Sequence, residues 1–112
     1  MDAMETINAE VVRQLAEELP PAILRSIICT FEADIIRLAQ ELLAASKAGD
    51  SDGYHRAAHS IAGAASAVGA SRLEHEARLA MNPNHNEASH IVMPRLMMEA
   101  KAAIEALRGM AP

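Results

Sequence analysis

The sequence predicts an all-α fold, an antiparallel four-helix bundle with a short N-terminal capping helix. Hydrophobic residues make up 51% of the 112 residues but aromatic residues only 2%, so the core must consist of Leu, Ile, Val, Met and Ala. These residues favour helix, as do the abundant Glu, Arg and Gln. The β-branched and aromatic runs that mark strands are short or missing. Because 112 residues is the usual size of one domain, we expect residues 1–112 to form a single one.

The first predicted helix is short and follows Asn8, a plausible N-cap. Ile7 and Val12 have the spacing of a hydrophobic staple across that cap. The pair Pro20 and Pro21 ends this helix and can open the next, since proline is tolerated in a first helical turn.

The second helix is expected from about Pro21 to about Lys47, with Gly49 as its C-terminal stop. Its apolar residues alternate spacings of four and three, which places them on one stripe suited to bundle packing. They are Leu24, Ile28, Phe31, Ile35, Leu38 and Leu42.

The third helix, about residues 51–68, carries the residues that point to function. Asp50 and its two successors offer N-caps, and Gly69 is the expected stop. Ser71 and Glu74 then form an S-x-x-E pattern, which predicts a capping box at the start of the fourth helix. The third and fourth helices should therefore form a tight antiparallel hairpin around Gly69.

The fourth helix is expected to end near Met81, and the turn residues of 82–86 predict a loop. In the last helix Pro94 either causes a kink or marks the first turn. The apolar stripe of this helix comprises Met93, Met97, Ala100, Ile104 and Leu107.

Charge and composition exclude several function classes. The formal net charge is -5, and neither the basic stripe of a nucleic-acid binder nor a polybasic membrane-binding segment is visible. The acidic N-terminus lacks the features of a signal peptide, and no apolar stretch approaches the ~20 residues that span a bilayer. Cys29 is the only cysteine, expected to be buried and inert. We expect a cytoplasmic monomer, and Met1 favours a free-standing protein.

The third helix is predicted to present His59 to solvent. At about 100° per residue, Ala57, Ile61, Ala64 and Val68 fall roughly opposite His59. The residues expected on the His59 side are His55, Arg56, Ala62, Gly63 and Ser66. A helical glycine costs roughly 1 kcal/mol against alanine, so this run of small residues calls for another explanation. Small side chains allow a second protein to approach the imidazole closely, as phosphoryl transfer between proteins requires.

This pattern resembles the histidine-containing phosphotransfer (HPt) domain. The family motif is a histidine, two spacers, usually Lys, then Gly, followed by small residues and a second Gly. The matching residues are His59, Gly63, Ala64, Ala65 and Gly69. Further similarity lies in Ala48-Gly49-Asp50, Ala57-Ala58, Ala70, Leu73, Phe31 and Asp34. The likeness extends from about Leu15 to about Leu107.

The resemblance implies a phosphorelay intermediate of two-component signalling. Neutral His59 would attack the phosphoryl group of a receiver-domain aspartate through a ring nitrogen, expected to be Nε2, and pass it to another receiver. The implied partners are receiver domains of response regulators, or a hybrid histidine kinase. The chain would need no cofactor of its own, since the Mg²⁺ would come with the receiver. We expect no kinase or ATPase activity, because no P-loop or glycine-rich nucleotide motif is present.

One position departs from the family pattern, because Ala62 stands where the family usually has Lys. That Lys is thought to lie near the phosphoryl group. We hypothesise that Arg56 or His55 partly replaces the missing charge. Arg56→Ala would then slow transfer at His59, and unchanged rates would end the idea for that residue.

Three alternatives remain open at this point. The first is a module of the same fold that binds receivers without transfer. The second is a metal-binding bundle, since His55 and His59 form an i, i+4 pair. No known ligand set includes His75, His85 or His90 at these spacings, and zinc titration would test this reading. The third is a helical scaffold unrelated to signalling.

Overall fold

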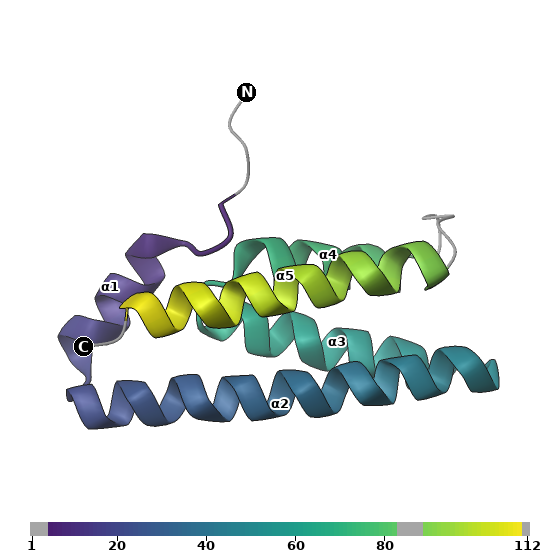
Figure 1. Cartoon of the computed structure of the whole chain (residues 1–112), viewed down its shortest axis with the longest axis horizontal. Helices are drawn as coiled ribbons and strands as arrows, with labels where there is room; N and C mark the ends of the chain where they lie inside the picture. Colours follow the sequence, from purple (N-terminus) through teal and green to yellow (C-terminus); the bar gives the residue numbers. More distant parts are fainter. Residues whose placement is uncertain (1–4, 83–88, 111–112) are drawn as a thin grey trace.

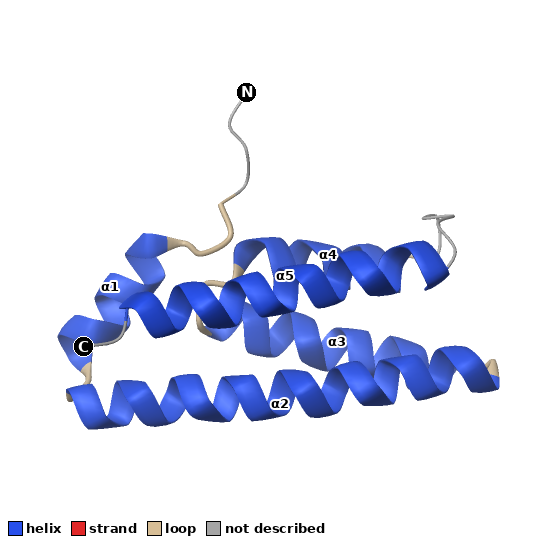
Figure 2. Ribbon diagram, viewed as in Figure 1, coloured by secondary structure: helices blue, strands red, loops and turns tan. Residues whose placement is uncertain are grey.

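The computed structural model describes residues 5–82 and 89–110, with the side chains of residues 89 and 90 left out. Within these ranges the chain forms five helices and no strand (Figures 1 and 2). The helices are α1 (Ala9–Glu18), α2 (Pro21–Ala48), α3 (Ser51–Ala67), α4 (Ser71–Met81) and α5 (Ser89–Met110). The predicted all-helical class is therefore confirmed, and no described helix is long and apolar enough to cross a membrane.

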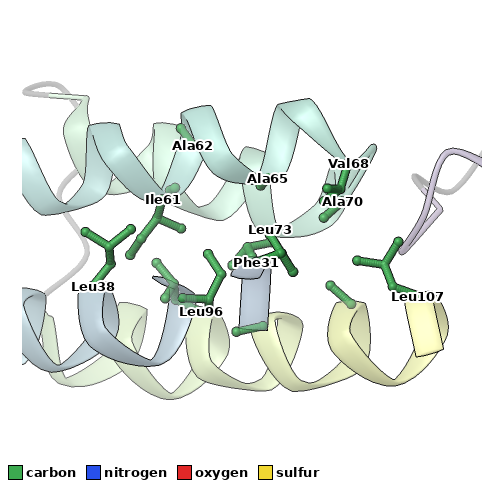
Figure 3. Close-up of a cluster of buried hydrophobic side chains, with 14 of the residues drawn as sticks. Phe31, Leu38, Ile61, Ala62, Ala65, Val68, Ala70, Leu73, Leu96 and Leu107 are labelled. Carbon is green, nitrogen blue, oxygen red and sulfur yellow. The ribbon is translucent and has the colours of Figure 1, made fainter. Parts of the chain in front are cut away.

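The four longer helices pack as a closed ring in which α3 lies between α2 and α4, while α5 completes the ring against those two. The short helix α1 lies at one end of this ring (Figure 1). Side chains from α2 to α5 fill the centre, among them Phe31, Leu38, Ile61, Leu73, Leu96 and Leu107 (Figure 3). Because α3 packs against both α2 and α4, these two helices fix the orientation of its outer surface.

Helix α2 supplies the longest side of the core. Its six predicted stripe residues are all buried, with exposed fractions of at most 6%. The helix ends at Gly49, which has φ 67°, a left-handed conformation that glycine adopts without steric cost. The prediction of a buried Cys29 is wrong, because this thiol is exposed. Cys29 follows Ile28 directly, and one residue turns the helix by about 100°, out of the stripe.

Both ends of α3 are fixed by backbone hydrogen bonds. At its start, the Gly53 N–H donates to Asp50 Oδ1 at 2.9 Å, which confirms Asp50 as the N-cap. At its end, the Ala70 N–H donates to the Ala65 carbonyl at 2.8 Å across Gly69. Gly69 has φ 72°, and a Cβ on it would lie 2.9 Å from Val11 Cβ. The Gly69 position thus requires glycine for both its conformation and its packing against α1.

The predicted capping box at the start of α4 is not formed. Ala70 is the N-cap and has no side chain that could bond the helix, while Ser71 is already the first helical residue. Glu74 pairs with Arg78 at 2.7 Å instead. The Ala70 N–H takes part in the turn that closes α3. The helix α4 therefore begins at Ser71, whereas the capping pattern predicts Ser71 as the N-cap and Arg72 as the first helical residue.

Helix α5 begins five residues before Pro94, so the reading of Pro94 as a first-turn residue is wrong. Of the predicted stripe, Met93, Ala100 and Leu107 are buried, whereas Met97 is 44% exposed. The predicted loop 82–86 falls outside the described residues except for Asn82.

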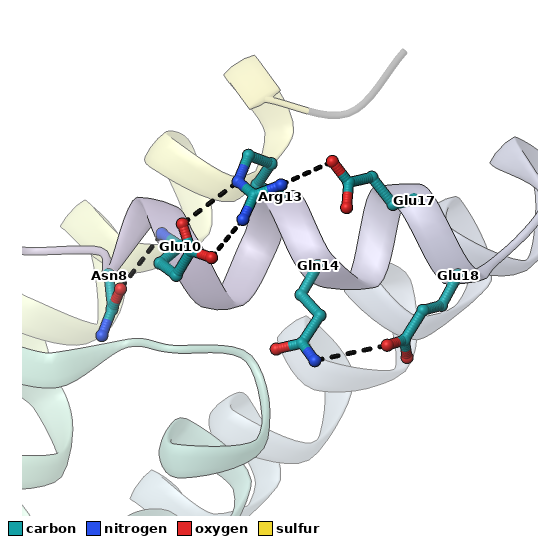
Figure 4. Close-up of polar contacts among 6 residues, drawn as sticks. All are labelled: Asn8, Glu10, Arg13, Gln14, Glu17 and Glu18. Atoms are coloured by element: carbon teal, nitrogen blue, oxygen red, sulfur yellow. Dashed lines mark hydrogen bonds and ion pairs between the residues drawn. The ribbon is translucent and has the colours of Figure 1, made fainter.

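Helix α1 is held together by polar contacts on its outer side (Figure 4). Asn8 Oδ1 accepts from the Glu10 N–H at 3.1 Å, as an N-cap should. Arg13 pairs with Glu10 and with Glu17, and these contacts raise the pKa of its guanidinium. The Asn8 N–H also donates to the Gly69 carbonyl at 2.7 Å. This bond fastens the start of α1 to the turn between α3 and α4.

Candidate functional site

The candidate site is built on the outer face of α3, near the middle of the helix. His59 is exposed, as predicted. The inner face of α3 consists of small and aliphatic side chains, which allows the helix to sit close to α2 and α4. Its buried residues are Ala57, Ala58, Ile61, Ala62 and Ala65. The arrangement holds an imidazole at the surface of a rigid helix, and no core packing depends on that imidazole.

A second imidazole lies beside the first. The rings of His55 and His59 are parallel within 5°, and their centroids are 6.5 Å apart. This geometry follows from their i, i+4 spacing, which stacks side chains along one face of a helix. Both residues are exposed, so a group attached to one ring has the other ring as a neighbour.

Four of the five residues predicted to surround His59 are exposed: His55, Arg56, Gly63 and Ser66. The expectation for Ala62 is wrong. Ala62 is only 1% exposed and belongs to the hydrophobic core (Figure 3). It lies about 60° around the helix from His59, and the buried arc of α3 extends that far because two neighbouring helices cover it. Ala62 therefore cannot contact a partner protein, and His59 lies near the edge of the exposed face.

Gly63 is the clearest sign of a surface kept free. A Cβ built on this residue would meet nothing within 4 Å, and its φ is not in the left-handed region. Neither packing nor backbone conformation within the described chain therefore requires glycine here. Glycine weakens a helix interior by roughly 0.5–1 kcal/mol relative to alanine, so Gly63 lowers the stability of α3 and leaves open space on its outer side.

A groove of about 590 Å³ lies between α2 and α3, on the Arg56 side of His59, and His59 itself does not line it. Ser60, the residue after His59, lines it together with Arg56. From α2 come Arg37 and Glu41, which pair with each other at 2.6 Å. The other residues that line the groove are Leu38, Asp50, Gly53 and the alanines Ala44, Ala45, Ala48 and Ala57. The contribution of α2 was not predicted, because a stripe of core residues does not reveal which flank of a helix borders the next helix.

Of the remaining histidines, one has a described side chain. His75 is exposed on α4, His85 lies outside the described residues, and His90 belongs to α5 but its side chain is not described. Within the described part of the chain, no group of three or more His, Cys, Asp or Glu residues is placed to hold a metal ion.

The comparison with protein families gave one match, to a model described as the Hpt domain, over residues 9–110. This range begins with the first residue of α1 and ends with the last residue of α5. The searches of curated proteins and of solved structures gave no match.

Proposed function

Since the chain belongs to the Hpt domain family, a family of phosphotransfer modules in two-component signalling, we propose that it is a phosphorelay intermediate that uses His59. In this proposal His59 accepts a phosphoryl group from a receiver-domain aspartate and passes it to another receiver. The chain acts as a phosphocarrier and not as a kinase. Its proposed setting is a cytoplasmic monomer with α2 to α5 in an antiparallel four-helix bundle.

The observation that carries the proposal is the exposed imidazole beside a glycine that the fold does not need. His59 is solvent-accessible on a helix that two neighbours hold in place. Gly63, one turn later on the same side, leaves open space where any other residue would project a Cβ. A receiver can thus bring its aspartyl phosphate to within bonding distance of the ring.

The proposed chemistry is a balanced in-line displacement. The lone pair of the neutral imidazole, at Nε2, attacks phosphorus while the bond from phosphorus to the aspartate oxygen breaks. The aspartate leaves as a carboxylate, and the phosphoryl group remains on nitrogen. Little covalent work falls to the protein, because such a step is accelerated mainly by positioning and by stabilising charge. The Mg²⁺ is proposed to come with the receiver.

The partner-contact surface is proposed to include His55, Arg56, Gly63 and Ser66 around His59. The groove between α2 and α3 extends this surface, and its charged residues Arg37, Glu41 and Arg56 offer polar contacts to a receiver. Gly69 has a structural role at the end of α3 and is not proposed to touch the partner.

The direct test mixes a receiver domain carrying labelled aspartyl phosphate with this protein. We expect an acid-labile label on the wild type and none on His59→Gln. His75→Gln is the matched control, because His75 is also an exposed helical histidine, and it should retain the label. Tight receiver binding without label would favour a docking module without transfer. Failure to bind any receiver of the same cell would favour an unrelated scaffold.

A further inference from the structure

Position 62, which usually carries a positive charge in the family, has an uncharged residue in this chain. Ala62 occupies the place where the family resemblance expects Lys, and it is 1% exposed. A phosphoryl group on His59 would bring negative charge to the surface of α3, and position 62 has no positively charged side chain to balance it. Some other group must meet that charge if the phosphorylated state is to be stabilised.

Two residues of α3 are candidates, and their surroundings distinguish them. Arg56 lines the groove toward α2 together with Arg37 and Glu41. His55 instead lies along the His59 ring, parallel within 5° and 6.5 Å away between centroids. On a helix the two candidates fall on opposite sides of His59, at about 60° and 40° from it. His55 is thus the candidate whose ring is stacked along the ring of the proposed nucleophile.

We propose that His55, as an imidazolium, is the residue that stabilises the phosphoryl group on His59 and thereby replaces the missing lysine. This inference rests on the proposed function and identifies the charge that stabilises the phosphorylated form of the same site. An opposite charge close to an ionisable group favours its charged form. Phosphorylation of His59 therefore makes His55 hold its proton to higher pH, and the protonated His55 makes the phosphorylated state of His59 more favourable.

Coulomb's law sets the size of the effect. With the 6.5 Å between the ring centroids taken as the separation of the two charges, one unit charge moves a titration midpoint by roughly half a pH unit in a water-like dielectric, and by more where solvent is excluded. A phosphoryl group carries more than one negative charge near neutral pH, so the expected upward movement is about half a unit to one unit. Where His55 is fully protonated, the same coupling changes the equilibrium of phosphoryl exchange by roughly three- to tenfold, and the change becomes smaller as pH rises.

Charged groups on α3 and on its two neighbours, α2 and α4, act on both states of the protein. They are Asp52 and Arg56 on α3, Arg25, Glu32, Asp34, Arg37, Glu41 and Lys47 on α2, and Arg72, Glu74, His75, Glu76 and Arg78 on α4. Several are already engaged, since Glu74 pairs with Arg78 and Glu76 with Arg95. Comparing His55 before and after phosphorylation of the same chain removes their common contribution.

The first experiment follows the His55 ring protons by NMR against pH. Potassium phosphoramidate is the phosphoryl donor, so no receiver is needed. We expect the His55 midpoint to be higher in the phosphorylated protein by half a unit or more, and Arg56→Ala to retain this difference. A midpoint that does not move overturns the proposal.

The second experiment measures how the phosphoryl group distributes between this protein and a receiver. His55→Gln should shift the distribution toward the receiver by roughly three- to tenfold, and His55→Lys should restore it while weakening its dependence on pH. Because His55 is exposed, neither change disturbs the core. Equal distributions in the wild type and His55→Gln would overturn this inference alone, whereas absence of label on His59 from every donor would overturn the proposed function with it.

Discussion

At the scale of single residues, the site depends as much on what is missing as on what is present. His59 is the proposed nucleophile, and the residue one turn later has no side chain at all. Gly63 has no neighbour that would exclude a Cβ, and its φ lies outside the left-handed region. The fold does not require glycine at this position, and the proposed function assigns the open space to an approaching receiver.

Gly63→Ala should therefore separate stability from function. We expect the free energy of unfolding to rise by about 0.5–1 kcal/mol, because alanine favours helix, while the rate of transfer from a receiver falls. Chemical denaturation and labelled-receiver kinetics measure the two effects. Gly109→Ala is the matched control in α5, another glycine with open space around it, and should leave transfer unchanged. Faster or equal transfer in Gly63→Ala would contradict the proposed approach surface.

Tyr54 gives a pH-dependent prediction at the same scale. Burial raises the pKa of its phenol above the ordinary value of about 10, since desolvation disfavours the charged phenolate. The folded state thus holds the phenolic proton more tightly than the unfolded chain does. The stability from this group is complete below pH ~10 and is lost as pH rises through the higher folded pKa. Tyr54→Phe should remove this loss, seen as a smaller decline of unfolding free energy between neutral and strongly alkaline pH.

At the scale of elements, the ends of helices were more predictable than their faces. Asn8, Asp50, Gly49 and Gly69 act as the sequence indicates, because caps depend on local hydrogen bonds and backbone conformation. Ser71 is the exception. The S-x-x-E pattern predicts Ser71 as the N-cap, but the left-handed turn at Gly69 makes Ala70 the N-cap and determines where α4 begins.

The burial of Ala62 shows that the sequence of α3 does not define the edges of the buried face of this helix. A helix between two neighbours buries a wide arc, and the sequence does not say on which side the second neighbour lies. Alanine gives no contrast between buried and exposed positions, so the polarity pattern of an alanine-rich helix leaves the edges of that arc undefined. His59 and its small neighbours were predictable from residue type, but the α2 side of the groove required the tertiary structure.

Gly69→Ala tests the end of α3 as an element. A left-handed conformation costs a residue with a Cβ about 1–2 kcal/mol, and here the new methyl group would also press on Val11 at 2.9 Å. We expect a loss of at least 1 kcal/mol, about that cost, in the free energy of unfolding, measured by urea denaturation. Gly49→Ala is an informative comparison, since Gly49 is also left-handed but has open space around it, and it should lose less. Equal losses would show that the contact with α1 contributes nothing.

At the scale of the whole molecule, the core and the site use opposite faces of the same helix. The aliphatic interior fixes α3 between α2 and α4, while α1 fastens the turn at its C-terminal end. The outer face of α3, which carries His55 and His59, therefore does not belong to the hydrophobic core. The composition predicted the helical class, and the stripe of α2 predicted the core. The ring arrangement of α2 to α5 required the structure, because short connections alone do not fix which helices touch.

The central claim is that His59 is the residue that carries the phosphoryl group. Phosphorus–proton correlation NMR of the protein after exposure to a phosphorylated receiver tests it most directly, because it identifies both the residue and the ring nitrogen. The account predicts one phosphoramidate signal, coupled to the ring protons of His59 and consistent with attachment at Nε2. A signal assigned to His55, His75 or any other residue would contradict the account, as would the absence of any phosphorus on the protein.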